Sequence, residues 1–159
     1  MVLARDPGRD EENAMSTRSL IAMETERGIE SVYCHSDGYP ENHAPILSHW
    51  YTTEDAVRAL MALGDLSILG REIGEAHDFN ARRFDDTETS DWCLAYGRDR
   101  GQKETASHTH ASEEALLAEA RDRWGEYVYL FRAGRWLYRA LFHDKGWIEI
   151  PVPTEAVHA

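Results

Sequence analysis

Cys34, His35 and Asp37 stand together at the end of a run of alternating apolar residues. They contain the groups of a nucleophile, a base and an orienting carboxylate. Side chains alternate between the two faces of a strand, so His35 and Asp37 point to one side and Cys34 to the other. This alternation counts against a Cys-His catalytic pair, because the thiol then needs a base from elsewhere. A shallow small-ligand site built from His35, Asp37, Tyr39 and Glu41 is the chemistry that this cluster allows.

The same cluster also fits a structural role. Cys34 is suited to a core as a small apolar residue, and an Asp at a turn commonly bonds its own backbone. Cys93, the second cysteine, also falls in an expected strand. We expect both thiols to be reduced, since a cytoplasmic chain rarely keeps disulfides.

Arg98, Asp99 and Arg100 form a second charged group. Guanidinium groups bind phosphate in a bidentate manner, whereas alternating charges favour a cluster that neutralises itself. An enzyme or small-ligand binder would require these three side chains to converge with His35 and Asp37 on one pocket.

The histidines lack the short, fixed spacing of a structural zinc site. Those considered as ligands are His35, His43, His49, His108 and His110. The chain also lacks a Gly-rich phosphate loop, a nucleophile elbow and a metalloprotease motif. We therefore predict no bound metal ion and no cofactor.

A β-hairpin over residues 19–34 must position the first cluster, because two alternating apolar runs flank a turn that ends at Gly28. A second hairpin is expected over residues 127–142, with a tight turn at Ala133 and Gly134. The pattern predicts helices over 41–51, 54–63 and 113–124, a buried strand over 92–96 and a last short strand over 147–150. Pro45 is tolerable in the first of these helices if it falls in the first turn. Residues 66–69 and 107–111 are expected to be loops.

These elements predict an α+β fold, with an antiparallel sheet built from the N-terminal and C-terminal hairpins and about three helices packed on one face. The length of 159 residues favours one domain, which we place at residues 15–150. Residues 1–14 are charged and are expected to form a flexible tail, and residues 151–159 a C-terminal tail.

The net charge of −12 argues against direct nucleic-acid binding, which needs a basic face. It fits instead a partner with a basic surface. The chain has no apolar run of the roughly 18 residues that a membrane span needs, and no secretory signal follows its first arginines. A cytoplasmic protein without membrane contact is expected.

Residues 72–91, here called the acid-rich segment, concentrate negative charge. Such a run is commonly a solvated loop, and the alternative is an acidic docking surface. Under that alternative, Asp85, Asp86, Glu88 and Asp91 are the candidate contacts with a partner.

Four motifs occur in order: STRS at 16–19, YCHSDGYPE at 33–41, LGDLS at 63–67 and AYGRDRG at 95–101. Together they resemble a group of small uncharacterised proteins of bacteriophages, prophages and mobile elements, and the resemblance covers nearly all of residues 15–142. It implies such an origin and a bacterial host, and it implies no particular activity. Ser36 departs from the family, which tends to have Trp there, so a stacking role does not carry over to this position.

Three hypotheses follow. The first is an acidic binding protein that acts on a host protein, for instance by mimicking nucleic-acid charge in host takeover or anti-defence. The second is an enzyme or small-ligand binder at the first cluster. The third is a homo-oligomeric structural protein that buries the aromatic hairpin 127–142 against its own copy.

Overall fold

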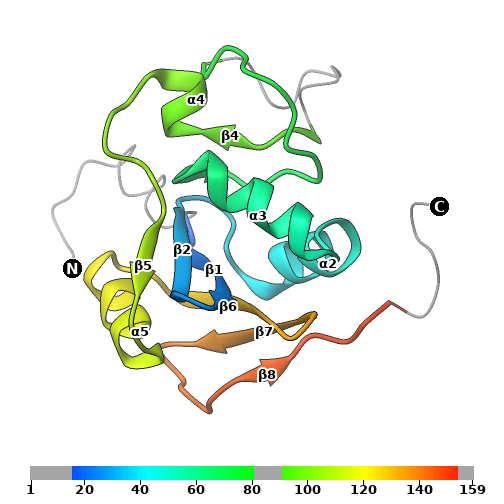
Figure 1. Cartoon of the computed structure of the whole chain (residues 1–159), viewed down its shortest axis with the longest axis vertical. Helices are drawn as coiled ribbons and strands as arrows, with labels where there is room; N and C mark the ends of the chain where they lie inside the picture. Colours follow the sequence, from blue (N-terminus) through cyan, green and yellow to red (C-terminus); the bar gives the residue numbers. More distant parts are fainter. Residues whose placement is uncertain (1–15, 81–90, 154–159) are drawn as a thin grey trace, which may run out of the picture.

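A mostly antiparallel β-sheet runs through the structure, a computed structural model that describes residues 16–80 and 91–153 (Figure 1). Its strands are β1 (Ser19–Thr25), β2 (Gly28–Cys34), β3 (Leu66–Ile68), β4 (Leu94–Ala95), β5 (His108–His110), β6 (Tyr127–Arg132), β7 (Arg135–Ala140) and β8 (Ile148–Glu149). The helices are α2 (Pro40–Trp50), α3 (Glu54–Leu63), α4 (Tyr96–Arg100) and α5 (Glu113–Asp122). The expected α+β class is confirmed. The expected tail at 1–14 and the last six residues of the expected C-terminal tail lie outside the described residues.

Both expected hairpins are present, β1 with β2 and β6 with β7. Gly28 has a positive φ of 131°, and a Cβ added to it would lie 2.5 Å from the carbonyl oxygen of His110. The strand order is β4-β3-β2-β1-β6-β7-β8, and β5 also pairs with β2. The two hairpins join through β1 and β6, which run parallel from the Ser19–Tyr127 pair to the Met23–Phe131 pair. The sequence pattern had indicated antiparallel pairing only.

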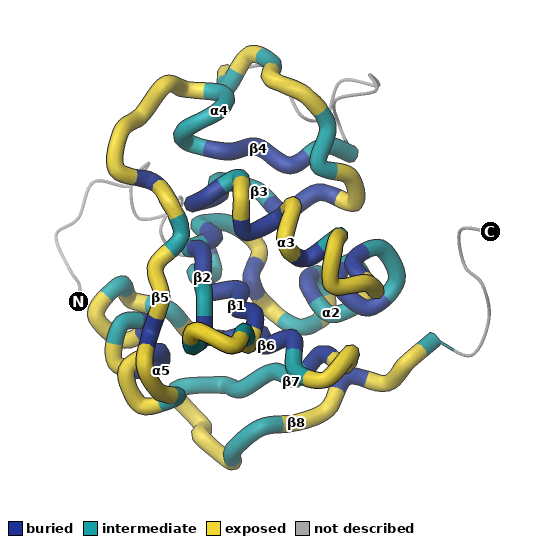
Figure 2. The backbone as a smooth tube through the Cα atoms, viewed as in Figure 1, coloured by how far each residue is buried: buried dark blue, intermediate teal, exposed yellow. Residues whose placement is uncertain are grey.

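Alternation along β1 divides the apolar core between the two faces of the sheet. Ile21 and Met23 pack in one cluster with residues of α2 and α3. Leu20 and Ala22 pack in another with residues of α5. Helices α2 and α3 thus cover one face, as expected, and α5 covers the other (Figure 1). Buried residues concentrate on the central strands β1 and β6 (Figure 2).

The helix ends follow the capping residues of the sequence. The side chain of Thr53 accepts the amide of Ala56 at 3.1 Å to begin α3, and Ser112 does the same for Ala115 in α5. Helix α2 begins at Pro40, so Pro45 lies inside the helix and not in its first turn. No helix among the described residues has the length and apolar character to cross a membrane.

Three short segments differ from their sequence-based expectations. Residues 66–68 and 108–110 are strands, because Leu66 pairs with Cys34 and His110 pairs with Ile29, near the two ends of β2. The charged turn around Asp99 is the short helix α4. The regular strand that precedes it spans only Leu94–Ala95. Segments this short lack a periodic pattern of their own, and their form depends on the strand beside them.

The end of α5 holds a tryptophan in a left-handed conformation. Trp124 has φ 63°, and its amide donates to the carbonyl of Arg121 at 3.1 Å. Glycine is the usual residue at such a position, because a Cβ costs roughly 1 kcal/mol there. Trp124→Gly is therefore expected to raise the free energy of unfolding by about 1 kcal/mol, as measured by urea denaturation. Trp124→Ala removes the ring but keeps the strain, so an equal gain in both variants would contradict this explanation.

Candidate functional site

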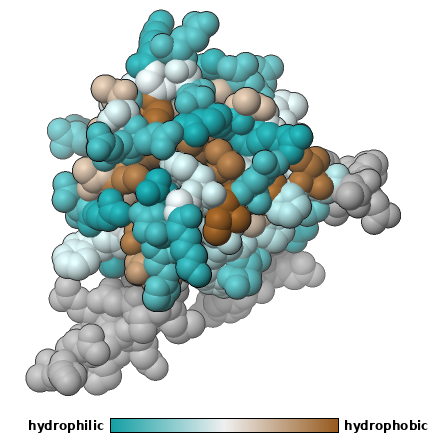
Figure 3. All heavy atoms as spheres, turned by 90° about the horizontal axis from the view of Figure 1, so that it is seen from below, coloured by the Kyte–Doolittle hydropathy of each residue, from teal (hydrophilic) through white to brown (hydrophobic). Residues whose placement is uncertain are grey.

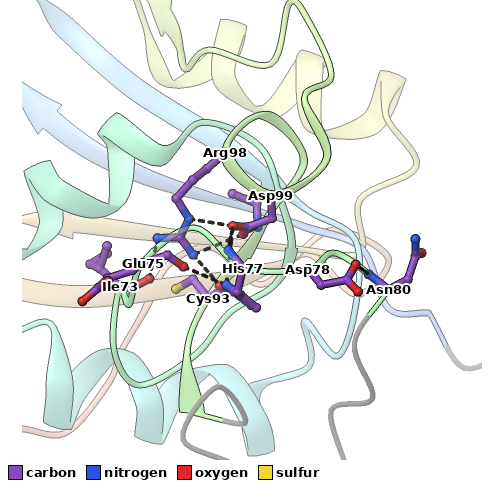
Figure 4. A network of polar contacts seen from close by, with 9 residues as sticks. Ile73, Glu75, His77, Asp78, Asn80, Cys93, Arg98 and Asp99 are labelled. Carbon is purple, nitrogen blue, oxygen red and sulfur yellow. Dashed lines mark hydrogen bonds and ion pairs between the residues drawn. The ribbon is translucent and has the colours of Figure 1, made fainter.

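A buried carboxylate lies at the centre of the network in Figure 4. The Asp99 side chain is fully buried, and it accepts hydrogen bonds from the amide of Ala95 at 2.8 Å and from the amide of His77 at 3.1 Å. The Nε of Arg98 donates to the same carboxylate at 2.9 Å. Burial alone would raise the pKa of Asp99, but these hydrogen bonds outweigh it, so the pKa lies below its ordinary value.

Arg98 extends the network to two further segments of the backbone. Its guanidinium donates to the carbonyl oxygen of Ile73 at 2.7 Å and to that of Cys93 at 2.8 Å. Arg98 and Asp99 together thus contact residues 73 and 77, near the start of the acid-rich segment, and residues 93 and 95, just beyond its end. The network therefore ties the start of this segment to β4 and α4, which follow it in the chain.

These contacts assign Arg98 and Asp99 an architectural role, because their donors and acceptors are taken up by the backbone of the protein. The guanidinium of Arg100 lies 5.3 Å from the ring centre of Phe79. The three side chains of this motif were candidates for a ligand pocket shared with His35. In the structure they instead hold the base of the acid-rich segment.

His35 belongs to a second group of polar contacts, on the α5 face of β2. The hydroxyl of Tyr33 lies 2.8 Å from Nδ1 of His35, and the guanidinium of Arg123 lies 4.4 Å from the Tyr33 ring centre. Arg123 also pairs with Asp65 at 2.9 Å. Burial raises the pKa of Tyr33, although the neighbouring cations Arg18 and Arg123 oppose this shift. In this group the Arg123 guanidinium stacks on the ring of Tyr33, and the imidazole of His35 lies beside the Tyr33 hydroxyl.

Sequence reasoning missed most of this second group. Strand alternation shows that Tyr33 and His35 share a face, and that signal was available. The residues Asp65 and Arg123 come from distant parts of the chain, and only the folding of α5 and β3 beside β2 brings them to Tyr33.

Asp37 and Tyr39 lie in the loop that leads into α2, and Glu41 lies at the start of the helix. Asp37 is exposed with φ 55°, and its carbonyl oxygen accepts a hydrogen bond from the side chain of Asn42 at 3.0 Å. Tyr39 precedes the helix and Glu41 lies in its first turn. The amide of Gly38 donates to the carbonyl of Thr17 at 2.8 Å, which fixes the loop to the start of β1. This geometry favours the structural interpretation of the loop.

The two cysteines are free and fully buried. Burial raises the pKa of Cys34 to about 12, so its thiol is a poor nucleophile near neutral pH. Cys93 accepts a hydrogen bond from the amide of Gly70 at 3.3 Å and lies 3.4 Å from the hydroxyl of Tyr51. These contacts are those of core residues.

The histidines considered as metal ligands are spread over separate environments. His43 is fully buried in α2 against the ring of Tyr129, whereas His108 is exposed and pairs with Glu119 at 2.7 Å. Within residues 16–80 and 91–153, no group of three or more His, Cys, Asp or Glu residues is placed to hold a metal ion.

Of the candidate partner contacts, Asp91 pairs with Arg71 at 3.2 Å, and both side chains are about half exposed. Asp85, Asp86 and Glu88 lie outside the described residues. The position of Asp91 next to the bridge between Glu72 and Trp92 places it at the base of the acid-rich segment.

Fold and site together define an α+β protein in which a buried Arg-Asp network holds the base of an acidic segment. No family model, curated protein or solved structure matches the chain. The function is therefore argued from the residues themselves.

Proposed function

We propose that the protein binds a partner protein with a basic surface through the acid-rich segment. The observation that carries this proposal is the Arg98–Asp99 network, which ties the start of the segment to β4 and α4 just beyond its end. Arg98 and Asp99 form a largely buried ion pair, and this pair is bonded to the start of a segment whose sequence is rich in Asp and Glu. We expect such a buried network where the position of the segment is important for binding.

Anchored ends lower the entropy that is lost when a loop becomes ordered on a partner. The net charge of −12 also accelerates the encounter with a basic surface and makes it sensitive to salt. Both effects support an acidic segment that acts as a docking element and not only as a solvated connection.

In its finer form, the proposal concerns a phage or mobile-element protein whose target is a host protein. A basic channel that normally holds nucleic acid, as in a defence nuclease or a transcription complex, fits the charge of the segment. Resemblance of the four sequence motifs to phage and prophage proteins supports this form.

The test removes four negative charges from the segment in the variant Asp85→Asn, Asp86→Asn, Glu88→Gln and Asp91→Asn. We expect it to lose capture of the partner from host lysate at low salt, because the complementary charge is gone. A matched control removes four exposed carboxylates elsewhere, in the variant Asp55→Asn, Glu114→Gln, Asp122→Asn and Glu126→Gln, and should keep capture. Undiminished capture by the segment variant would refute the proposal, and equal loss in both variants would assign binding to net charge alone.

Self-association through the hairpin 127–142 has less support as a function. The aromatic residues Tyr129, Phe131 and Trp136 of this hairpin are buried in the core of the protein. Seen from the β8 side, hydrophilic side chains cover much of the surface and apolar ones lie between them in small patches (Figure 3). A large contiguous apolar patch is the usual mark of a stable homodimer face.

A further inference from the structure

Three aromatic side chains gather around a small one where β6 pairs with β7. Tyr127 of β6 is paired with Ala140 of β7. Residues two apart on a strand share a face, so Tyr138 lies beside Ala140 on the face that Tyr127 occupies. Beyond Ala140, the ring of Phe142 contacts that of Tyr127, with ring centres 5.6 Å apart and ring planes at 82°. Ala140 thus lies between Tyr127, Tyr138 and Phe142, here called the aromatic cluster.

The aromatic cluster is held in place and is also accessible from solvent. Tyr127 and Tyr138 are half-buried against the core on the face that α2 covers, which fixes their rings. Phe142 is 56% exposed, and its ring contacts are with Tyr127 and with His143 at 5.0 Å. An exposed phenylalanine gains little from burial within its own protein. Its position therefore favours a contact with a ligand.

A carboxylate lies next to the aromatic cluster and is free to attract a cation. Burial raises the pKa of the Tyr127 hydroxyl, and Glu41 is the charged neighbour that adds most to this rise. Glu41 acts in the same direction on Tyr129, the next residue of β6 on this face. Its side chain is exposed and forms no ion pair or hydrogen bond within the part of the chain that the structure describes.

Aromatic rings beside a free carboxylate attract an organic cation. The faces of the rings are electronegative, and the carboxylate adds a full negative charge. A guanidinium or primary ammonium group carries several N–H donors, each of which needs an acceptor, whereas this site supplies a single carboxylate. A quaternary ammonium group has no N–H donor and is bound through its methyl groups by aromatic rings. The composition of the site therefore favours a quaternary ammonium group.

We propose that the aromatic cluster and Glu41 bind a quaternary ammonium group, which lies against the rings of Tyr127, Tyr138 and Phe142 above Ala140. The site is separate from the acid-rich segment, and binding at it needs no partner protein. Two sources share this chemistry: a small molecule such as choline, and a trimethyllysine side chain of a protein.

A titration with choline chloride, followed by NMR of the backbone amides at neutral pH, tests the site. Sodium chloride at equal ionic strength serves as the blank. Choline is expected to give saturable shifts at Tyr127, Tyr138 and Ala140. Dimethylbutanol, in which a carbon replaces the ammonium nitrogen, has the same shape without the charge and is expected to bind at least about tenfold more weakly.

Two variants separate the contribution of the rings from that of the charge. Phe142→Leu is expected to weaken choline binding about fivefold, and Glu41→Gln about threefold. Both positions are exposed, and thermal unfolding checks that each variant is folded. The matched controls Trp124→Leu and Glu114→Gln change exposed residues outside the site and should bind choline as the wild type does.

A peptide with one trimethyllysine identifies the source of the ligand. Tighter binding of this peptide than of choline would assign the site to a methylated protein, and tighter binding of choline to a small molecule; both results support the proposal. Equal binding of dimethylbutanol and choline would overturn it. So would shifts confined to other residues, unchanged affinity in Phe142→Leu, or tighter binding of the same peptide with unmodified lysine.

Discussion

Replacement of Asp99 by Ala is expected to lower the free energy of unfolding by about 3 kcal/mol, the magnitude for breaking a largely buried ion pair. The Arg98 guanidinium, whose side chain is only 17% exposed, would lose its counter-charge. The amides of Ala95 and His77 would lose their acceptor at the same time. The contacts that hold the start of the acid-rich segment beside β4 and α4 should be lost together with the network. Capture of the partner is therefore expected to fall even where the chain remains folded.

Urea denaturation measures the loss, and Asp91→Ala is the matched control. Asp91 also pairs with an arginine, but both side chains are about half exposed, so the control is expected to cost less than about 1 kcal/mol. Similar costs for the two variants would refute the central role of Asp99. Because folding lowers the pKa of Asp99, its contribution is present above the ordinary Asp pKa of about 3.9 and is lost as the pH falls below that value.

His43 is expected to make the fold sensitive to acid. The side chain is fully buried and its Nε2 has no hydrogen-bond partner, and burial lowers its pKa to about 3. In the unfolded chain a histidine has a pKa of about 6.5. Between these two values the unfolded state binds the additional proton, so stability falls as the pH is lowered, by up to about 1.4 kcal/mol per pH unit.

Urea denaturation over the pH range from 7 to 4 tests this, since it covers most of that interval. His43→Leu is expected to show a weaker loss of stability toward acid than the wild type, because leucine takes up no proton. His143→Asn removes an exposed histidine and should leave the wild-type profile unchanged. Parallel profiles for His43→Leu and the wild type would show that the burial of His43 is not the cause.

Local patterns in the sequence determined the elements that have a strong period or a clear boundary. Alternation around Gly28 and around Ala133 and Gly134 predicted both hairpins, and these are present. The helices predicted to start at residues 54 and 113 are present as α3 and α5, which begin at these residues. Such signals act within a few residues, so they can be seen without knowledge of the fold.

Contacts between distant segments were decided by the tertiary structure. The parallel pairing of β1 with β6 and the strands β3 and β5 depend on neighbours that no local pattern identifies. The charged motif around Asp99 had been a candidate ligand site, and its position beside Ile73 and His77 makes it a structural network instead. Composition determined the acidity of this protein, but where a charge is buried or exposed depends on packing between segments far apart in the chain.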